Sequence, residues 1–114
     1  MSDTRSISWV SAARREFEKF PVKVQAVGLA ALTVAAEGGK TDNAKPLHGL
    51  GSGVFEIVLN DRAGTFRVVY AVQLGDDLWV LHAFQKKSKT GRKTPRLEID
   101  LVRDRLKRLK EMLR

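Results

Sequence analysis

The spacing of apolar residues predicts two helices near the start of the chain. Apolar side chains at helical intervals alternate with charged ones in the first segment: Val10, Ala13, Phe17 and Phe20. Pro21 disfavours helix in the residue before it, so this helix should end at Phe20. Ile7–Val10, just ahead of it, suits a short first strand.

A second helix is predicted over 22–37, because Pro21 suits a first helical turn and Gly38-Gly39 suit a helix end. Its expected buried stripe is made of small and branched residues: Val24, Val27, Ala31 and Ala35. We expect the two segments to form a helical hairpin.

Three strands are predicted next, over 54–59, 65–72 and 78–85, because each is apolar and short turns with Gly, Asn or Asp separate them. Such short turns favour an antiparallel meander. Residues 40–53 hold four Gly or Pro residues without periodicity, so we expect a loop there.

The last helix should begin at Thr94-Pro95, with Thr94 as the N-cap and Pro95 in the first turn. Its apolar stripe repeats at helical spacing: Ile99, Val102, Leu106, Leu109 and Leu113. The predicted order is (β)ααβββα, a single α+β domain over residues 1–114.

Strand alternation assigns side chains to the two faces of the predicted sheet. One face should be apolar and carry the helical hairpin: Phe55, Ile57, Leu59, Phe66, Val68, Tyr70, Val72, Trp79, Leu81 and Ala83. The other mixes charge with an aromatic ring: Glu56, Val58, Arg67, Val69, Val80, His82, Phe84 and Lys86. A one-residue bulge would exchange the faces of a strand. The mixed face is either open to solvent or covered by the C-terminal helix.

The charge of this chain is concentrated at one end. The net charge is +8, and residues 86–114 hold the whole excess of Lys and Arg. A localised basic block favours a phosphate-backbone partner, although a solvated basic helix would also produce it. The chain has no cysteine, which excludes disulfides and thiolate chemistry. No signal peptide or membrane span is evident, so a soluble, cytoplasmic protein is expected.

The mixed face carries the candidate chemistry. Arg67 offers a planar fork for a phosphate, Glu56 or His82 a base, and Phe84 a flat ring on which a base could stack. Each residue alone also fits a structural role, such as an ordinary Glu–Arg pair between strands. No His, Asp or Glu spacing suggests a metal site, so no metal or other cofactor is predicted.

Several stretches together resemble the phage-related, HigB-like branch of the RelE toxin superfamily. They are the sequences Gly-Val-Phe-Glu-Ile, Phe-Arg-Val-Val-Tyr, Val-Leu-His-Ala-Phe-Gln-Lys-Lys and Lys-Thr-Pro-Arg-Leu-Glu-Ile. The resemblance covers about residues 7–113, and the stretch 66–99 is its most specific part. It implies a microbial RNase-like fold, ribosome-dependent cleavage of mRNA, and a cognate helix-turn-helix antitoxin in a hetero-oligomeric complex.

The resemblance also implies site residues. Arg67 matches an arginine that binds the phosphate and the transition state. Lys86 and Lys87 match a basic pair at the rim of the active site, and Phe84 matches the aromatic residue before that pair. Glu56 and His82 match a glutamate and a histidine of the same strands, whereas Val58 stands where many relatives have arginine. Further RNA contacts are expected from the basic loop and the helix start: Lys89, Arg92, Lys93 and Arg96.

The implied reaction uses the nucleophile that RNA carries. The 2′-OH would attack the adjacent phosphate and leave a cyclic phosphate end, while Arg67 neutralises charge and Lys86 or Lys87 adds charge or donates a proton. We expect the Arg67 guanidinium to point into a cationic groove beside these lysines. Two alternatives remain: a non-catalytic nucleic-acid-binding module or phage-derived regulator, and an interaction protein whose last helix docks on an acidic partner.

Overall fold

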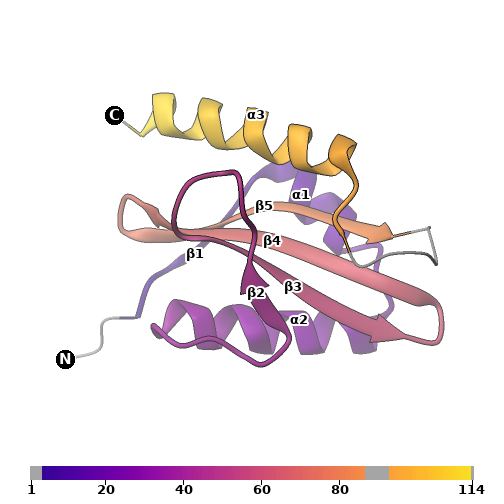
Figure 1. Ribbon diagram of the computed structural model, residues 1–114. Helices are drawn as coiled ribbons and strands as arrows, with labels where there is room; N and C mark the ends of the chain where they lie inside the picture. Colours follow the sequence, from indigo (N-terminus) through magenta and orange to yellow (C-terminus); the bar gives the residue numbers. More distant parts are fainter. Residues whose placement is uncertain (1–3, 87–92, 114) are drawn as a thin grey trace.

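A mixed five-stranded sheet forms the centre of the computed structural model, which describes residues 4–86 and 93–113 (Figure 1). Its strand order is β1-β5-β4-β3-β2. The elements in chain order are β1 Ile7–Trp9, α1 Ser11–Phe17, α2 Val22–Ala36, β2 Ala44–Pro46, β3 Val54–Asp61, β4 Gly64–Leu74, β5 Asp77–Lys86 and α3 Arg96–Met112. The α+β class, the two N-terminal helices, the meander and the last helix are all confirmed.

The antiparallel meander of β3, β4 and β5 is the body of the sheet. The short first strand, β1, is also confirmed, and it pairs in parallel with β5 at one edge. At the other edge the structure corrects the prediction. Residues 40–53 are not all loop, because Ala44–Pro46 pairs with β3 as a three-residue strand. A strand this short, containing proline, has no periodicity that a sequence pattern could reveal.

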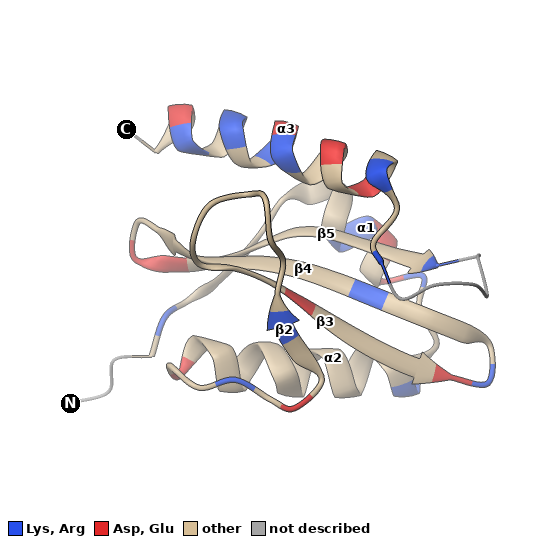
Figure 2. Cartoon of the chain, in the orientation of Figure 1, with Lys and Arg blue, Asp and Glu red and all other residues tan. Residues whose placement is uncertain are grey.

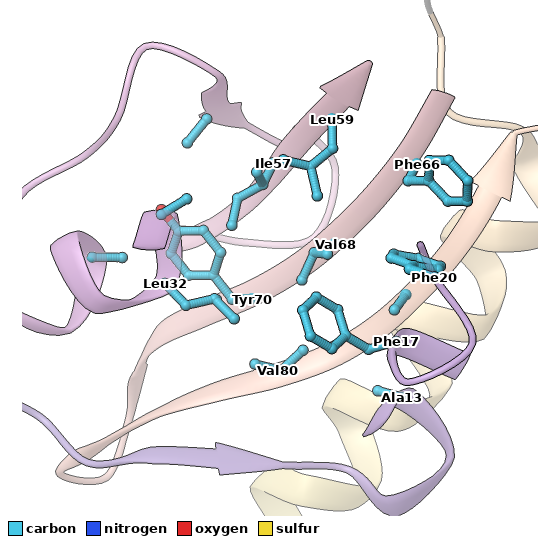
Figure 3. Packing of buried hydrophobic residues seen from close by; sticks show 14 of the residues in the cluster. Ala13, Phe17, Phe20, Leu32, Ile57, Leu59, Phe66, Val68, Tyr70 and Val80 are labelled. Atoms are coloured by element: carbon cyan, nitrogen blue, oxygen red, sulfur yellow. The ribbon is translucent and has the colours of Figure 1, made fainter. Parts of the chain in front are cut away.

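Both faces of the sheet are covered, α2 lying on one side and α3 on the other (Figure 1). The core under α1 and α2 is aromatic and aliphatic, with Phe17, Phe20 and Phe66 in contact through tilted rings (Figure 3). Gly28 allows α2 to lie close to the ring of Phe17 in α1, because an added Cβ would be only 3.0 Å from Phe17 Cε1. The predicted stripe of α2 is right except at Val27, which is 51% exposed.

A bulge in β5 changes the predicted face assignment. The pairing passes from Val69–His82 to Tyr70–Val80, which leaves Leu81 as an extra residue in β5. Trp79 and Leu81 therefore pack on the α3 side, and Val80 packs on the α2 side, the reverse of the prediction. Beyond the bulge the predicted alternation holds, so Ala83 packs on the α2 side.

The mixed face is covered by α3, one of the two alternatives left open by the sequence. Val102, Leu106 and Leu109 of α3 are buried against a cluster that includes Val69 and Leu81. Leu113, expected on the same stripe, is 43% exposed. The polar residues of the sheet consequently lie at or under the N-terminal half of α3, rather than on an open surface.

Candidate functional site

Three neighbouring strands bring the predicted polar residues together. Cross-strand pairing sets Val58 opposite Arg67 and Arg67 opposite Phe84, so Glu56 and Arg67 are diagonal neighbours on adjacent strands. Thr65 lies opposite Lys86, which places Lys86 at the end of β5 next to the same region. The shared face predicted for Glu56, Arg67, Phe84 and Lys86 is therefore observed.

Glu56 and Arg67 form a buried ion pair, and Thr94, which lies just before α3, hydrogen-bonds to both. Arg67 Nη1 donates to Glu56 Oε1 at 2.8 Å and to Thr94 Oγ1 at 3.3 Å. The Thr94 hydroxyl in turn donates to Glu56 Oε2. The exposed fractions of the Glu56 and Arg67 side chains are 0% and 4%, so the pair is shielded from solvent.

This pair corrects two expectations. Thr94 is not the N-cap of α3, because Pro95 occupies that position and the Thr94 hydroxyl is directed to Glu56 instead. The Arg67 guanidinium does not point into an open groove, because the carboxylate of Glu56 on the neighbouring strand is its partner. A buried charge needs such a partner, and the observed one is the Glu–Arg pair between strands that the sequence analysis gave as the structural alternative.

His82 connects β5 to α3 through both of its ring nitrogens. Arg105 Nη1 lies 3.1 Å from Nδ1, and Glu98 Oε1 lies 2.9 Å from Nε2. Since an arginine can only donate, Nδ1 accepts, and Nε2 carries the proton and donates to Glu98. Burial lowers the pKa of His82, although the nearby Glu98 carboxylate opposes that shift.

Phe84 is buried, with 7% of its surface exposed, and therefore is not the open stacking surface expected from the sequence. Its ring stacks on His82 with 5.0 Å between ring centroids and an interplanar angle of 20°. His82 is in turn held by Glu98 and Arg105 of α3, and a short sequence pattern does not reveal such contacts with a distant helix.

Lys86 lies between the buried pair and the surface. Its side chain is largely covered, and Nζ donates to the Lys93 carbonyl at 2.9 Å. The pKa of Lys86 is lowered, first by burial and then by the positive charges of Arg67 and Lys45, while Glu56 opposes the shift. A lysine with a lowered pKa can exchange its proton near neutral pH more readily than an ordinary one.

Exposed cations lie near Lys86 and the buried ion pair. Lys93 and Arg96, both predicted, are exposed, and so is Lys45 of β2, which pairs with Glu56 in the sheet register. Lys45 was missed because its segment was expected to be loop, and only the pairing of β2 with β3 brings it near. Lys87, Lys89 and Arg92 lie outside the described residues.

Across residues 4–86 and 93–113, no three His, Asp or Glu side chains gather closely enough to hold a metal ion. In the same part of the chain, none of the helices has the length and apolar character needed to span a bilayer.

Solved structures with this fold include RelE toxins and a chain of a toxin–antitoxin complex. The isolated RelE toxin of E. coli superposes with a TM-score of 0.57 at 17% identity, covering 88% of this chain and 98% of that one. A substituted E. coli RelE in the free state gives a TM-score of 0.59 at 17% identity, with coverage of 92% and 97%. A chain of the RelBE2 toxin–antitoxin complex of Mycobacterium tuberculosis gives 0.51 at 20% identity, with coverage of 75% and 94%. The fold implied by the resemblance to RelE is thereby confirmed.

No protein with a curated description matches the chain. The profile of one sequence family does match, and its description is "Phage derived protein Gp49-like (DUF891)". The match runs from residue 15 to residue 107 and includes every described residue of the candidate site. This chain therefore belongs to the phage-derived Gp49-like family.

Proposed function

We propose that this protein is the toxin of a type II toxin–antitoxin pair and that it cleaves mRNA on the ribosome as an endoribonuclease. The fold it shares with RelE toxins supports the toxin role. A relative solved within a toxin–antitoxin complex supports an antitoxin partner, which we propose to be a helix-turn-helix protein. The proposed substrate places the protein in the cytoplasm.

One observation carries the nuclease proposal: Lys86 lies beside the buried Arg67–Glu56 pair and near exposed cations. Lys45, Lys93 and Arg96 would attract the RNA backbone by charge. Lys86, whose pKa is lowered by burial and by Arg67, would then meet the scissile phosphate and exchange a proton with the RNA. Arg67 would act mainly as a positioning residue, because its guanidinium is held by Glu56 and Thr94.

In the proposed reaction the 2′-oxygen attacks the adjacent phosphorus and the bond to the 5′-oxygen breaks. The products are a 2′,3′-cyclic phosphate and a 5′-hydroxyl end. Neutral Lys86 would accept the 2′-proton, or its ammonium form would give a proton to the leaving 5′-oxygen; these two roles have opposite pH dependence. His82 is the less suitable base, since both of its ring nitrogens are engaged by α3.

The test compares Lys86→Gln with Lys86→Arg after induced expression, by growth and by mapping 5′ ends of mRNA with and without ribosomes. Both variants should lose cleavage by about 10²–10⁴-fold, as expected for a missing proton-transfer group, while Lys86→Arg should still bind RNA. Full cleavage by Lys86→Arg would show that only its charge matters. No new mRNA ends with the wild-type chain would contradict the nuclease proposal.

A second candidate is a regulator that binds nucleic acid without cutting it. The burial of Arg67 and Phe84 and the engaged nitrogens of His82 favour it, since these groups are not open to a substrate. This function predicts RNA or DNA binding by the wild-type chain, with mRNA ends unchanged after induction.

A further inference from the structure

The side of α3 that faces the β2–β3 connection carries a row of cations. Arg96, Arg103, Lys107 and Lys110 follow one another at intervals of seven, four and three residues, so they lie along a single stripe of the helix, with Asp100 between the first two. All four side chains are exposed. The row extends for about 21 Å along the helix axis, at about 1.5 Å per residue. Figure 2 shows the positive positions recurring along α3.

A shallow groove runs beside this row. Its volume is about 260 Å³, and its lining residues come from α3 and from the β2–β3 connection: Gly49, Leu50, Arg103, Leu106, Lys107 and Lys110. Figure 1 shows that connection rising from the sheet toward α3. Leu50 and Leu106 are buried, and the three exposed cations line the groove beside them.

The charges of the row are available to a ligand. Within the described residues, neither Lys107 nor Lys110 forms an ion pair. Arg103 pairs with Asp100 at 2.9 Å, but both side chains are more than half exposed, and such surface pairs are weak. A polyanion could therefore engage Arg103 at little cost.

The chemistry of the groove favours a double-helical ligand over a single strand. Single-stranded sites combine cations with aromatic rings on which bases stack, and no aromatic side chain lines this groove. Double-stranded RNA is recognised by its shape and through phosphate and 2′-OH contacts, for which a straight row of cations is suited.

We propose that this flank of α3 binds the phosphate backbone of double-helical RNA, at a surface separate from the Lys86 site. The identification of RNA as the nucleic acid rests on the proposed function. The Lys86 region would take the single strand to be cut, while the α3 flank anchors the protein on a folded RNA nearby.

The experiment removes three charges from this flank and, as a matched control, three from elsewhere. The test variant is Arg103→Gln/Lys107→Gln/Lys110→Gln; the control is Arg14→Gln/Lys19→Gln/Lys23→Gln, which changes residues of α1, α2 and their connection that are also exposed. Fluorescence anisotropy is measured over a salt series on a labelled RNA duplex of about 16 base pairs and on an unstructured RNA of equal length. Poly-glutamate serves as an acidic competitor.

The test variant should bind the duplex more weakly, and its salt slope should fall by about one for each cation removed, hence by about three. The control should retain the wild-type slope, and single-strand binding should change less than duplex binding. Equal losses in both variants, or a loss confined to the single strand, would overturn the proposal. Competition by poly-glutamate at the same charge concentration would overturn it in favour of an acidic protein.

The outcome is independent of cleavage. Duplex binding through α3 by a chain that generates no mRNA ends would support this inference and reject the nuclease. Cleavage with unchanged duplex binding in the test variant would reject the α3 surface alone.

Discussion

At the residue scale, the buried ion pair of Glu56 and Arg67 dominates the site. Its two charges are removed from water, and each is tolerated because the other and Thr94 lie within hydrogen-bonding distance. The sequence pattern correctly places both residues on one face. It does not reveal their burial, because that depends on Thr94 and on α3, which lie 38 or more residues away from Glu56 in the chain.

Removing Arg67 should therefore destabilise the fold as well as affect function. Arg67→Ala leaves the Glu56 carboxylate buried without its cation, and we expect the free energy of unfolding to fall by about 3–5 kcal/mol. The double variant Glu56→Leu/Arg67→Met should lose much less, because it removes both charges. Urea denaturation of the two variants measures the difference. A loss below about 1 kcal/mol in Arg67→Ala would show that the carboxylate finds other compensation.

His82 should make stability depend on pH. Its lowered pKa means that the unfolded chain binds a proton at higher pH than the native chain does. Its stabilising contribution is complete above the unfolded pKa of about 6.5 and is lost as the pH falls from there toward the lowered native pKa. The charged groups facing it are Glu98 and Arg105 of α3 and Glu16 of α1.

The measurement is the melting temperature of the wild type and of His82→Gln between about pH 5 and pH 8. Glutamine keeps one donor and one acceptor but does not titrate in this range. The variant should therefore show a smaller drop in melting temperature at acid pH. Parallel curves for the two proteins would mean that His82 does not control this dependence.

At the element scale, α3 is attached to the sheet by polar contacts as well as by its apolar stripe. Thr94, just before the helix, contacts Glu56, and Glu98 and Arg105 within the helix contact His82. The stripe was predictable because 3.6-residue periodicity is a local property. The polar contacts were not, since each joins α3 to a residue on a distant strand.

Thr94→Val tests the first of these contacts. Loss of the hydroxyl removes a hydrogen bond from a buried carboxylate, and we expect a destabilisation of about 1.5–3 kcal/mol. Helix content should not change, because Thr94 does not cap α3. Thr94→Ser, which retains the hydroxyl, is the control and should keep most of the stability in thermal denaturation followed by circular dichroism. Equal losses in both variants would point to packing of the methyl group instead.

At the scale of the whole molecule, one sheet is shared by two cores. Trp9 packs on the α1–α2 core and Trp79 on the α3 core. The two cores use alternate residues of the same strands, β3, β4 and β5, so opening of one core should disturb the other. This sharing predicts that the chain unfolds as one cooperative domain.

The two tryptophans provide the test, since the chain has only these two. In Trp9→Phe and Trp79→Phe variants, the remaining tryptophan reports on one core. Each variant's fluorescence transition in urea should coincide with its own loss of circular dichroism. Separate transitions in either variant would show that α3 detaches before the rest of the fold.

The sequence by itself determined the elements whose signals are local: the helices from their periodicity, the long strands from their alternation, and the basic character of the C-terminal end. It also determined that Glu56, Arg67, Phe84 and Lys86 share a face, because a strand repeats every two residues. Only the tertiary structure decided that α3 covers that face and that Lys45 joins the site. It also decided that a bulge at Leu81 exchanges the faces on which part of β5 packs. These features depend on contacts between segments far apart in the chain, and burial of a charge is decided by its neighbours in space.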